Sequence, residues 1–223
     1  MNLIRSLAFY GVFYLGTLPL LLLVPLQGRR GIRRVAGAWT KLHRWSVHHL
    51  LSIRIIQEGG PVDGPALYAM RHESFFEAID AACVFEEPVI FAKQELFRIP
   101  IWGSAATKYG LIPVARDEGA KALRSLMRAA KVAKEEGRPF LIFPEGTRTP
   151  HGEEGAIVSG FAGLYKLLGL PVVPVAVNSG PLYRGLIKRR GQITYRFGEA
   201  IPAGLPRSEI EARVQEGINA LQP

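Results

Sequence analysis

Ala66-Leu-Tyr-Ala-Met-Arg-His-Glu-Ser-Phe-Phe-Glu77 is the stretch of sequence that decides the fold. It opens as a short apolar run, becomes polar at Arg71, and continues into a predicted helix. A buried strand that leads through a polar loop into a helix is the repeating unit of α/β domains. The polar residues directly follow the predicted strand 66–70, so they lie at its carboxyl end, where such domains place their functional sites.

Six more short apolar runs alternate with helical stretches along the rest of the chain. We expect strands over residues 52–57, 88–92, 111–115, 140–143, 172–177 and 192–197. This alternation predicts an α/β domain with a central, mainly parallel or mixed sheet of about seven strands flanked by helices. The domain is expected to cover residues 51–223, after an N-terminal membrane segment over residues 1–50.

Two of the intervening helices have readable limits. The longest runs from about Gly119 to Glu136, and apolar residues at helical spacing predict its buried side. These residues are Leu123, Met127 and Ala130. Ser208 followed by Glu211 is a capping-box pattern, which predicts the beginning of a C-terminal helix.

The first 50 residues predict contact with a membrane. Leu7–Leu26 contains twenty residues without a charge, enough to span a bilayer as a helix. The following Gly28-Arg-Arg-Gly-Ile-Arg-Arg34 suits anionic headgroups. A signal peptide is disfavoured, because only Arg5 precedes the run and no small-residue cleavage site follows it. Two glycines and two prolines favour a bent or shallow insertion over a straight spanning helix, and both readings stay open.

A second helix is predicted over Ile32–Leu50, with an apolar stripe and basic residues beside it. The stripe consists of Ile32, Val35, Ala36, Trp39 and Leu42. This pattern predicts a helix lying in the membrane interface, with a helix packed on the α/β domain as the alternative. His43, His48 and His49 are expected to be interfacial or solvated rather than metal ligands, since no carboxylate cluster accompanies them.

The charge balance indicates an anionic partner. The chain has 28 lysines and arginines against 19 aspartates and glutamates, a formal net charge of +9. Nucleic acid, an acidic membrane and a phosphorylated substrate all fit this excess. We expect membrane lipid rather than nucleic acid, because the N-terminus is apolar and no nucleic-acid-binding module or zinc-ligand spacing is present. The single cysteine, Cys83, excludes a disulfide within these residues and is expected to be a small buried hydrophobe.

His72 and Glu77 are candidates for acid–base chemistry. A histidine takes a proton from an alcohol readily near neutral pH, and a carboxylate on its other ring nitrogen fixes the tautomer and stabilises the imidazolium. Five residues apart on one helix, the two side chains would point about 140° apart. They therefore meet only if His72 precedes the helix and Glu77 lies in its first turn, with Ser74 as the cap. The alternative is that Glu77 serves only a capping box with Ser74.

Glu145-Gly146-Thr147-Arg148 follows another predicted strand and forms a second candidate site. Glycine allows close approach of the backbone to a ligand, threonine offers a hydroxyl, and arginine binds phosphate through paired hydrogen bonds. An ordinary exit from a strand, with a surface arginine, is the alternative.

These two motifs and three further segments occur in the order typical of the glycerolipid acyltransferase family, and the chain resembles its bacterial 1-acylglycerol-3-phosphate acyltransferases. The further segments are Lys93-Gln-Glu-Leu96, Gly110-Leu-Ile-Pro-Val-Ala-Arg116 and Val172-Val-Pro-Val-Ala176. The resemblance covers roughly Tyr68 to Asn178, and Phe143-Pro-Glu-Gly-Thr-Arg148 is its most specific match. The family more often has aspartate where this chain has Glu77, although one branch also carries glutamate.

The resemblance implies transfer of an acyl group from a thioester, acyl-CoA or acyl carrier protein, to the sn-2 hydroxyl of 1-acylglycerol-3-phosphate, which yields phosphatidic acid. His72 would be the base and Glu77 would orient it. Phosphate binding is implied for Lys93, Arg116 and Arg148. Glu145 and Thr147 would contact the glycerol region or shape the loop, and backbone amides near Gly146 are the expected donors to a developing oxyanion. No metal or redox cofactor is implied.

Two alternatives to this function stay open. The same chemistry could serve another lyso-lipid acceptor, such as a lyso-aminolipid, or the chain could bind lipid on this fold without catalysis. The second is disfavoured, because binding alone needs no base beside a carboxylate. The expected location is a bacterial inner membrane, with the catalytic domain facing the cytoplasm and in contact with anionic lipids. We expect no nucleic-acid partner and no obligate protein partner.

Overall fold

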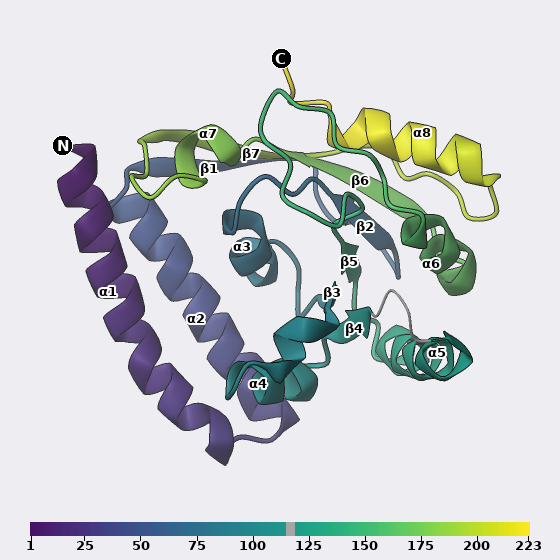
Figure 1. Ribbon diagram of the computed structural model, residues 1–223, viewed down its shortest axis with the longest axis horizontal. Helices are drawn as coiled ribbons and strands as arrows, with labels where there is room; N and C mark the ends of the chain where they lie inside the picture. The colour runs from purple at the N-terminus through teal and green to yellow at the C-terminus, as the bar shows by residue number, and fades with distance from the viewer. Residues whose placement is uncertain (115–118) are drawn as a thin grey trace.

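The computed structural model describes residues 1–114 and 119–223 of the chain (Figure 1). Within these residues, a seven-stranded sheet has the order β1-β7-β6-β2-β5-β3-β4. Its strands are β1 Ile53–Glu58, β2 Leu67–Met70, β3 Val89–Lys93, β4 Ile112–Val114, β5 Phe140–Ile142, β6 Val172–Val177 and β7 Gly191–Phe197. Neighbouring strands are parallel except for the antiparallel pair β6 and β7. The predicted α/β sheet is confirmed, and each strand ends within about one residue of its predicted range.

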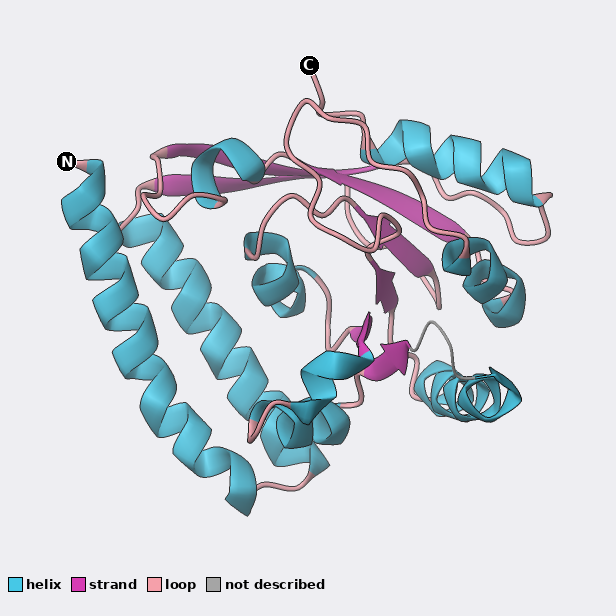
Figure 2. Cartoon of the chain, in the orientation of Figure 1, coloured by secondary structure: helices cyan, strands magenta, loops and turns pink. Residues whose placement is uncertain are grey.

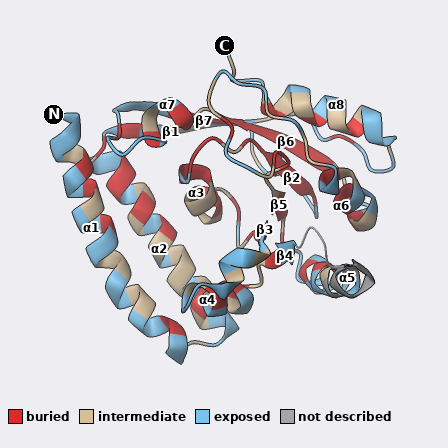
Figure 3. Ribbon diagram, in the orientation of Figure 1, coloured by how far each residue is buried: buried red, intermediate tan, exposed pale blue. Residues whose placement is uncertain are grey.

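Helices cover both faces of this sheet. They are α1 Asn2–Leu23, α2 Arg29–His49, α3 Phe76–Val84, α4 Trp102–Tyr109, α5 Gly119–Glu135, α6 Gly160–Leu168, α7 Gly180–Tyr183 and α8 Arg207–Ile218, with 3-10 turns η1 Val24–Leu26 and η2 Gln94–Arg98. One face packs against α3, with α1 and α2 outside it, and the other packs against α5, α6 and α8. Figure 3 shows the buried residues concentrated on the sheet and on the inward sides of these helices.

The alternation of side chains along β2 builds both layers at once. Leu67 and Ala69 belong to the core under α5, α6 and α8. Tyr68 and Met70 belong to the core under α1, α2 and α3. Successive residues of a strand point to opposite faces, and a strand covered on both faces must be apolar throughout. This is why the segment before Arg71 reads as a continuous apolar run.

The buried side of α5 differs from the predicted one. Met127 is 48% exposed, and the side chain of Leu123 lies outside the described residues. The helix packs on the sheet through Leu126, Ala130 and Ala133, so only Ala130 matches the prediction among the described side chains. Both sets have helical spacing, and the hydrophobic period alone could not choose between them.

The predicted capping box of the C-terminal helix does not form. α8 begins at Arg207, behind Pro206, whose carbonyl accepts a hydrogen bond from Ile210 N at 3.0 Å. Glu211 pairs instead with Arg207, its Oε1 lying 2.9 Å from Nε. Proline, with its fixed φ, suits the position before the first turn, and Ser208 therefore lies inside the helix.

α1 and α2 lie side by side along one edge of the molecule (Figure 2). Asn2–Leu26 is long and apolar enough to cross a membrane, and most of it is exposed. The helix continues through Pro19 and ends in the 3-10 turn η1. A long apolar surface without protein cover is compatible with membrane association.

The apolar stripe of α2 faces the protein. Ile32 is buried, Leu42 packs against the main core, and Trp39 Nε1 donates to Thr17 Oγ1 of α1 at 3.0 Å. The interfacial prediction for this stripe is therefore wrong, and the alternative of a helix packed on the domain is correct. The reason is that α1, α3 and α4 all contact α2, and Tyr109 of α4 packs with Ile32 at the amino-terminal end of the stripe.

His43 is fully buried, contrary to the expectation of an interfacial or solvated residue. Its Nε2 lies 2.7 Å from the hydroxyl oxygen of Tyr183, and three phenylalanine rings surround it. Burial, together with nearby positive charges, lowers the pKa of His43 to about 3. His48 and His49 are exposed, as expected.

Acid is expected to destabilise the protein through His43. The native state keeps this side chain neutral until its lowered pKa of about 3 is reached, whereas the unfolded chain binds the proton below its ordinary pKa of 6.5. The contribution of His43 to stability is therefore complete above pH 6.5 and is lost progressively as the pH falls towards 3. At pH 4 the loss is on the order of 3 kcal/mol, at 1.36 kcal/mol per pKa unit.

Urea unfolding in mild detergent at neutral pH and at pH 4 measures this loss. His43→Gln is the control, because glutamine still offers Tyr183 a hydrogen bond but does not titrate. The variant should lose clearly less stability between the two pH values than the parent. Equal losses in both proteins would contradict the assignment.

Candidate active site

His72 lies where β2 ends, in the loop before α3. β2 is a central strand with β6 and β5 as its neighbours. Nδ1 of His72 is 2.9 Å from Oε1 of Glu77. The His72 ring stacks on Phe143 with centroids 4.2 Å apart, and 16% of the side chain is exposed. Nδ1 is thus occupied, while Nε2 has no hydrogen-bond partner among the described residues.

Glu77, in the first turn of α3, is the partner of the histidine and also binds the backbone amides just before the helix. Its Oε1 also accepts hydrogen bonds from the backbone amides of Glu73 at 2.6 Å and Ser74 at 2.7 Å. Ser74 Oγ accepts a hydrogen bond from Phe76 N at 3.0 Å and donates to Glu77 Oε2 at 3.1 Å. The dyad with His72 therefore forms, together with one half of the capping box. Glu77 accepts from the Ser74 amide, but the N-cap position is Phe75 and the Ser74 hydroxyl accepts from Phe76 N rather than from Glu77 N.

Ser179, which follows β6, completes the surroundings of Glu77. Its hydroxyl donates to Oε2 at 2.6 Å. Burial raises the pKa of Glu77, but hydrogen bonds from His72, Ser179 and Ser74 outweigh this and hold the pKa below its ordinary value. The carboxylate is therefore ionised at neutral pH, as the partner of a developing imidazolium must be. Sequence reasoning missed Ser179, which lies 102 residues from Glu77.

The loop after β5 is tied to the backbone of His72. Glu145 is buried, and its Oε2 accepts a hydrogen bond from His72 N at 2.8 Å. The His72 carbonyl accepts one from Thr149 N at 2.7 Å. Gly146 has a φ of +64°, which favours glycine, and its amide donates to the Phe143 carbonyl at 3.0 Å. This amide is engaged in the turn, so the expected oxyanion donors near Gly146 stay a prediction for the neighbouring amides.

Arg148 and Thr147 are exposed on the same loop. The guanidinium carbon of Arg148 lies 4.1 Å from the ring centroid of Phe75, which is itself 60% exposed. A cation–π contact of this kind orients the arginine and leaves its in-plane donors open. The cation of Arg148 therefore lies over Phe75, which is three residues after His72 at the carboxyl edge of the sheet.

Of the two other predicted cations, only Lys93 lies among the described residues. Lys93 is exposed at the end of β3. β5 separates β3 from β2, so the ends of these strands are about 10 Å apart, at two strand spacings. Lys93 shares the carboxyl edge of the sheet with His72, without a described contact to it. Arg116 lies outside the described residues.

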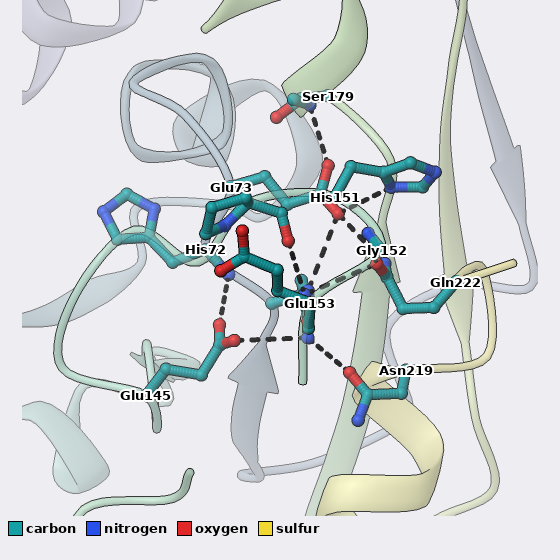
Figure 4. Close-up of polar contacts among 12 residues, drawn as sticks. His72, Glu73, Glu145, His151, Gly152, Glu153, Ser179, Asn219 and Gln222 are labelled. Atoms are coloured by element: carbon teal, nitrogen blue, oxygen red, sulfur yellow. Dashed lines mark hydrogen bonds and ion pairs between the residues drawn. The ribbon is translucent and has the colours of Figure 1, made fainter. Parts of the chain in front are cut away.

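Arg71 is a central residue of the site that sequence reasoning missed. It is fully buried, with Nη1 3.2 Å from Glu145 Oε1 and Nε 3.6 Å from Glu73 Oε1. It also donates hydrogen bonds to Asn219 Oδ1 and to the Glu153 carbonyl. Figure 4 shows these partners converging from the loops and from the end of α8. The guanidinium therefore holds in place the carboxylate that binds the His72 amide.

Glu73 links this arginine to the rest of the carboxyl edge. It is fully buried and accepts hydrogen bonds from Gly180 N at 2.7 Å, His151 Nδ1 at 2.9 Å and Gln222 Nε2 at 2.9 Å. The one feature of the sequence that could have indicated a role for Arg71 is its charge directly after a buried strand. No local pattern could connect it with residues near position 220.

The described residues contain no group of three or more His, Cys, Asp or Glu side chains that could hold a metal ion. Cys83 is half-buried on α3, and burial raises the pKa of its thiol. A raised pKa disfavours the thiolate, so Cys83 is poorly suited to act as a nucleophile. The chemistry available is that of His72 and Glu77, which can take a proton from a hydroxyl group, beside the exposed cation of Arg148.

Residues 52–178 match the profile of the family described as Acyltransferase. The chain is 30% identical to a 1-acyl-sn-glycerol-3-phosphate acyltransferase of Pseudomonas aeruginosa, over 90% of this chain and 81% of that protein. It is 28% identical to a lyso-ornithine lipid O-acyltransferase of the same organism, over 97% and 91% of the two chains. The crystal structure of the 1-acyl-sn-glycerophosphate acyltransferase of Thermotoga maritima has the same fold, with a TM-score of 0.71 at 21% identity, and the match covers 98% of this chain and 93% of that one.

Proposed function

The chain belongs to the Acyltransferase family, and on this premise we propose that it acylates the sn-2 hydroxyl of 1-acylglycerol-3-phosphate to give phosphatidic acid. In broader terms, the chain is an O-acyltransferase of lysophospholipids. The observation that carries the proposal is the His72–Glu77 pair, with Nδ1 held by a buried carboxylate and Nε2 left for a substrate. A donor thioester, acyl-CoA or acyl carrier protein, supplies the acyl group.

In the proposed mechanism, His72 acts first as a base and then as an acid. Because Glu77 holds the proton on Nδ1, Nε2 accepts the proton of the acceptor hydroxyl. The hydroxyl oxygen attacks the thioester carbonyl, a carbon–oxygen bond forms, and the carbon–sulfur bond breaks as the tetrahedral intermediate collapses. The departing thiolate takes the proton back from Nε2. Glu77 stabilises the imidazolium between the two transfers, and the thioester is activated enough to make an acyl-enzyme unnecessary.

Arg148 supports an acceptor that carries a phosphate. Phe75 orients its guanidinium, and the donors of the guanidinium are open to a bidentate contact with phosphate oxygens. We assign Lys93, and Arg116 by its place in the motif order, to the same anionic group. The exposed hydroxyl of Thr147 would contact the glycerol region.

Glu145 and Gly146 act indirectly in this proposal. Glu145 is buried and bonds to the His72 amide, so it shapes the loop rather than touching the acceptor. Gly146 provides the left-handed turn that brings Thr147 and Arg148 to the surface. No resident cofactor takes part in the proposed reaction.

A lyso-ornithine lipid is the second candidate acceptor. The relative of that name aligns with 97% of this chain, more than the 90% aligned with the 1-acyl-sn-glycerol-3-phosphate acyltransferase. An amide-linked ornithine headgroup carries one carboxylate beside an ammonium group. A phosphate carries more negative charge and no neighbouring cation, however, so an exposed arginine favours the phosphate. For either acceptor we propose that α1 anchors the protein in a bacterial inner membrane, with the dyad on the cytoplasmic side where acyl thioesters are made.

The test supplies purified protein in mild detergent with each acceptor and each donor, and follows products by mass spectrometry. We expect phosphatidic acid from 1-acylglycerol-3-phosphate with at least one donor, at a kcat/KM well above that for the lyso-ornithine lipid. His72→Ala should form product at least about 1,000-fold more slowly, within the range of general-base effects. Acylation of only the ornithine lipid would replace the proposed acceptor, and an equal rate in the variant would remove His72 from the mechanism.

A further inference from the structure

We propose that residues 184–190 form a second membrane-docking element, which binds the surface of an anionic bilayer beside α1. This docking loop reads Arg184-Gly-Leu-Ile-Lys-Arg-Arg190 and follows α7. Figure 1 shows the segment after α7 next to the amino-terminal end of α1. The inference rests on the proposed membrane association of α1, and it does not depend on the acyl-transfer step.

The tip of the docking loop is apolar and exposed. Leu186 is 84% exposed and Ile187 is 51% exposed. Two adjacent large aliphatic side chains in water lose the stabilisation that burial gives such residues. An exposed apolar cluster rimmed by polar residues is typical of a protein or membrane contact.

The docking loop is held firmly, so the exposure of its tip is built into the fold. Lys188 is buried, and its Nζ donates to the Tyr183 carbonyl and lies 4.0 Å from the centroid of the Tyr183 ring. The amide of Lys188 donates to Ser6 Oγ at 2.8 Å. The hydroxyl of Tyr10 donates to the Leu186 carbonyl at 2.6 Å. Two hydrogen bonds with α1 thus fix the loop relative to the apolar helix.

The rest of the docking loop is cationic. Arg184, Arg189 and Arg190 are exposed, and in the part of the chain that the structure describes none has an acidic partner. Arg190 also lines a shallow hollow together with His48 and Arg54. Basic residues around an apolar tip suit a bilayer with negatively charged headgroups, with the tip at the boundary of the acyl region.

An acidic protein would also complement these charges, but the position of the loop favours the bilayer. The neighbouring turns of α1 expose Leu3, Ile4 and Leu7. The apolar tip of the loop therefore extends the exposed apolar surface of α1, which we propose is covered by lipid. The loop is also joined to the site, because α7 connects it to Ser179, whose hydroxyl donates to Glu77. Docking would therefore hold this end of the site at the surface from which an amphiphilic acceptor arrives.

A fluorescent label at position 187 tests the inference. Ile187→Cys is labelled with nitrobenzoxadiazole in a Cys83→Ala background, and the full chain is added to vesicles of equimolar phosphatidylcholine and phosphatidylglycerol. Val132→Cys in the same background is the matched control, because Val132 is 47% exposed and α5 lies at the opposite edge of the molecule (Figure 1). We expect vesicles to protect the label at 187 severalfold from iodide and to expose it to headgroup nitroxides, while the label at 132 stays open to iodide.

Replacing all three arginines with glutamine, as Arg184→Gln, Arg189→Gln and Arg190→Gln, tests the charges. A basic residue near an anionic surface contributes about fivefold to binding, so the local docking equilibrium should weaken about 100-fold and the protection should disappear. Equal iodide access at 187 and 132 in the unaltered loop would overturn the inference. Protection by an acidic carrier protein, with none from vesicles, would do the same. The labelling experiment needs no turnover, so the two proposals can fail separately. If the enzyme forms product but vesicles do not protect the label at 187, only the docking loop is refuted. If vesicles protect the label but no product forms, only the acyl-transfer proposal is refuted.

Discussion

Exchange of Glu77 for glutamine is expected to lower kcat by about 100- to 1,000-fold, within the range of general acid–base effects. The amides of Glu73 and Ser74 both donate to Oε1, so they would hold the oxygen of the glutamine in the same place. The proton therefore stays on Nδ1 of His72 and the correct tautomer is kept. What the variant loses is the negative charge that stabilises the imidazolium, and KM for the acceptor should change little.

Glu77→Ala is the informative comparison for this prediction. It removes both the charge and the acceptor that fixes the tautomer, so kcat should fall further, to about 10,000-fold below the parent. It also leaves the amides of Glu73 and Ser74 without their acceptor, which costs about 1 kcal/mol in addition. Steady-state kinetics and thermal unfolding of the two variants separate these effects. If glutamine were as damaging as alanine in kcat, the charge alone would account for the contribution of Glu77, and fixing the tautomer would add nothing.

Arg71→Met is expected to destabilise the fold by about 3–5 kcal/mol, because it leaves buried carboxylates without their cation. Glu73 and Glu145 both lie beside the guanidinium, and all three side chains are buried. For a chain of this length the melting temperature should fall by about 6–20 °C. Activity should fall as well, because Glu145 holds the amide of His72.

Urea and thermal unfolding in detergent micelles measure the effect of Arg71→Met. Arg207→Met is the matched control, since it breaks the exposed pair of Arg207 with Glu211 and should cost less than about 1 kcal/mol. Adding Glu73→Gln and Glu145→Gln to Arg71→Met should restore part of the stability, because the unpaired charges are then removed. A loss no larger than that of the control would show that the buried cation contributes little.

The strands and the histidine–carboxylate pair could be predicted because their signals are local. The strands before Arg71 and Glu145 are short apolar runs that end at polar loops, and the requirement that His72 precede the helix follows from helical geometry alone. The resemblance to a known family then supplied roles for residues such as Arg148. Its exposure beside the dyad is consistent with the role that the resemblance implied.

The parts that could not be predicted depend on contacts between distant segments. The same amphipathic stripe on α2 suits a membrane interface or a protein core, and only the positions of the helices packed against it decide for the core. His43 is buried for the same reason. Ser179, Asn219 and Gln222 join the site through the arrangement of the sheet and α8, which no spacing in the sequence expresses.

The dependence of Arg71 on Asn219 also has a consequence for the order of events during synthesis. The two residues are 148 positions apart, so β2 leaves the ribosome long before the side chain that completes the surroundings of the guanidinium. Through that interval the guanidinium of Arg71 lacks one of its partners, while α1 is already free to enter a bilayer. Membrane attachment would therefore precede the closing of the site, and a nascent chain would reach lipid before it is competent to modify lipid.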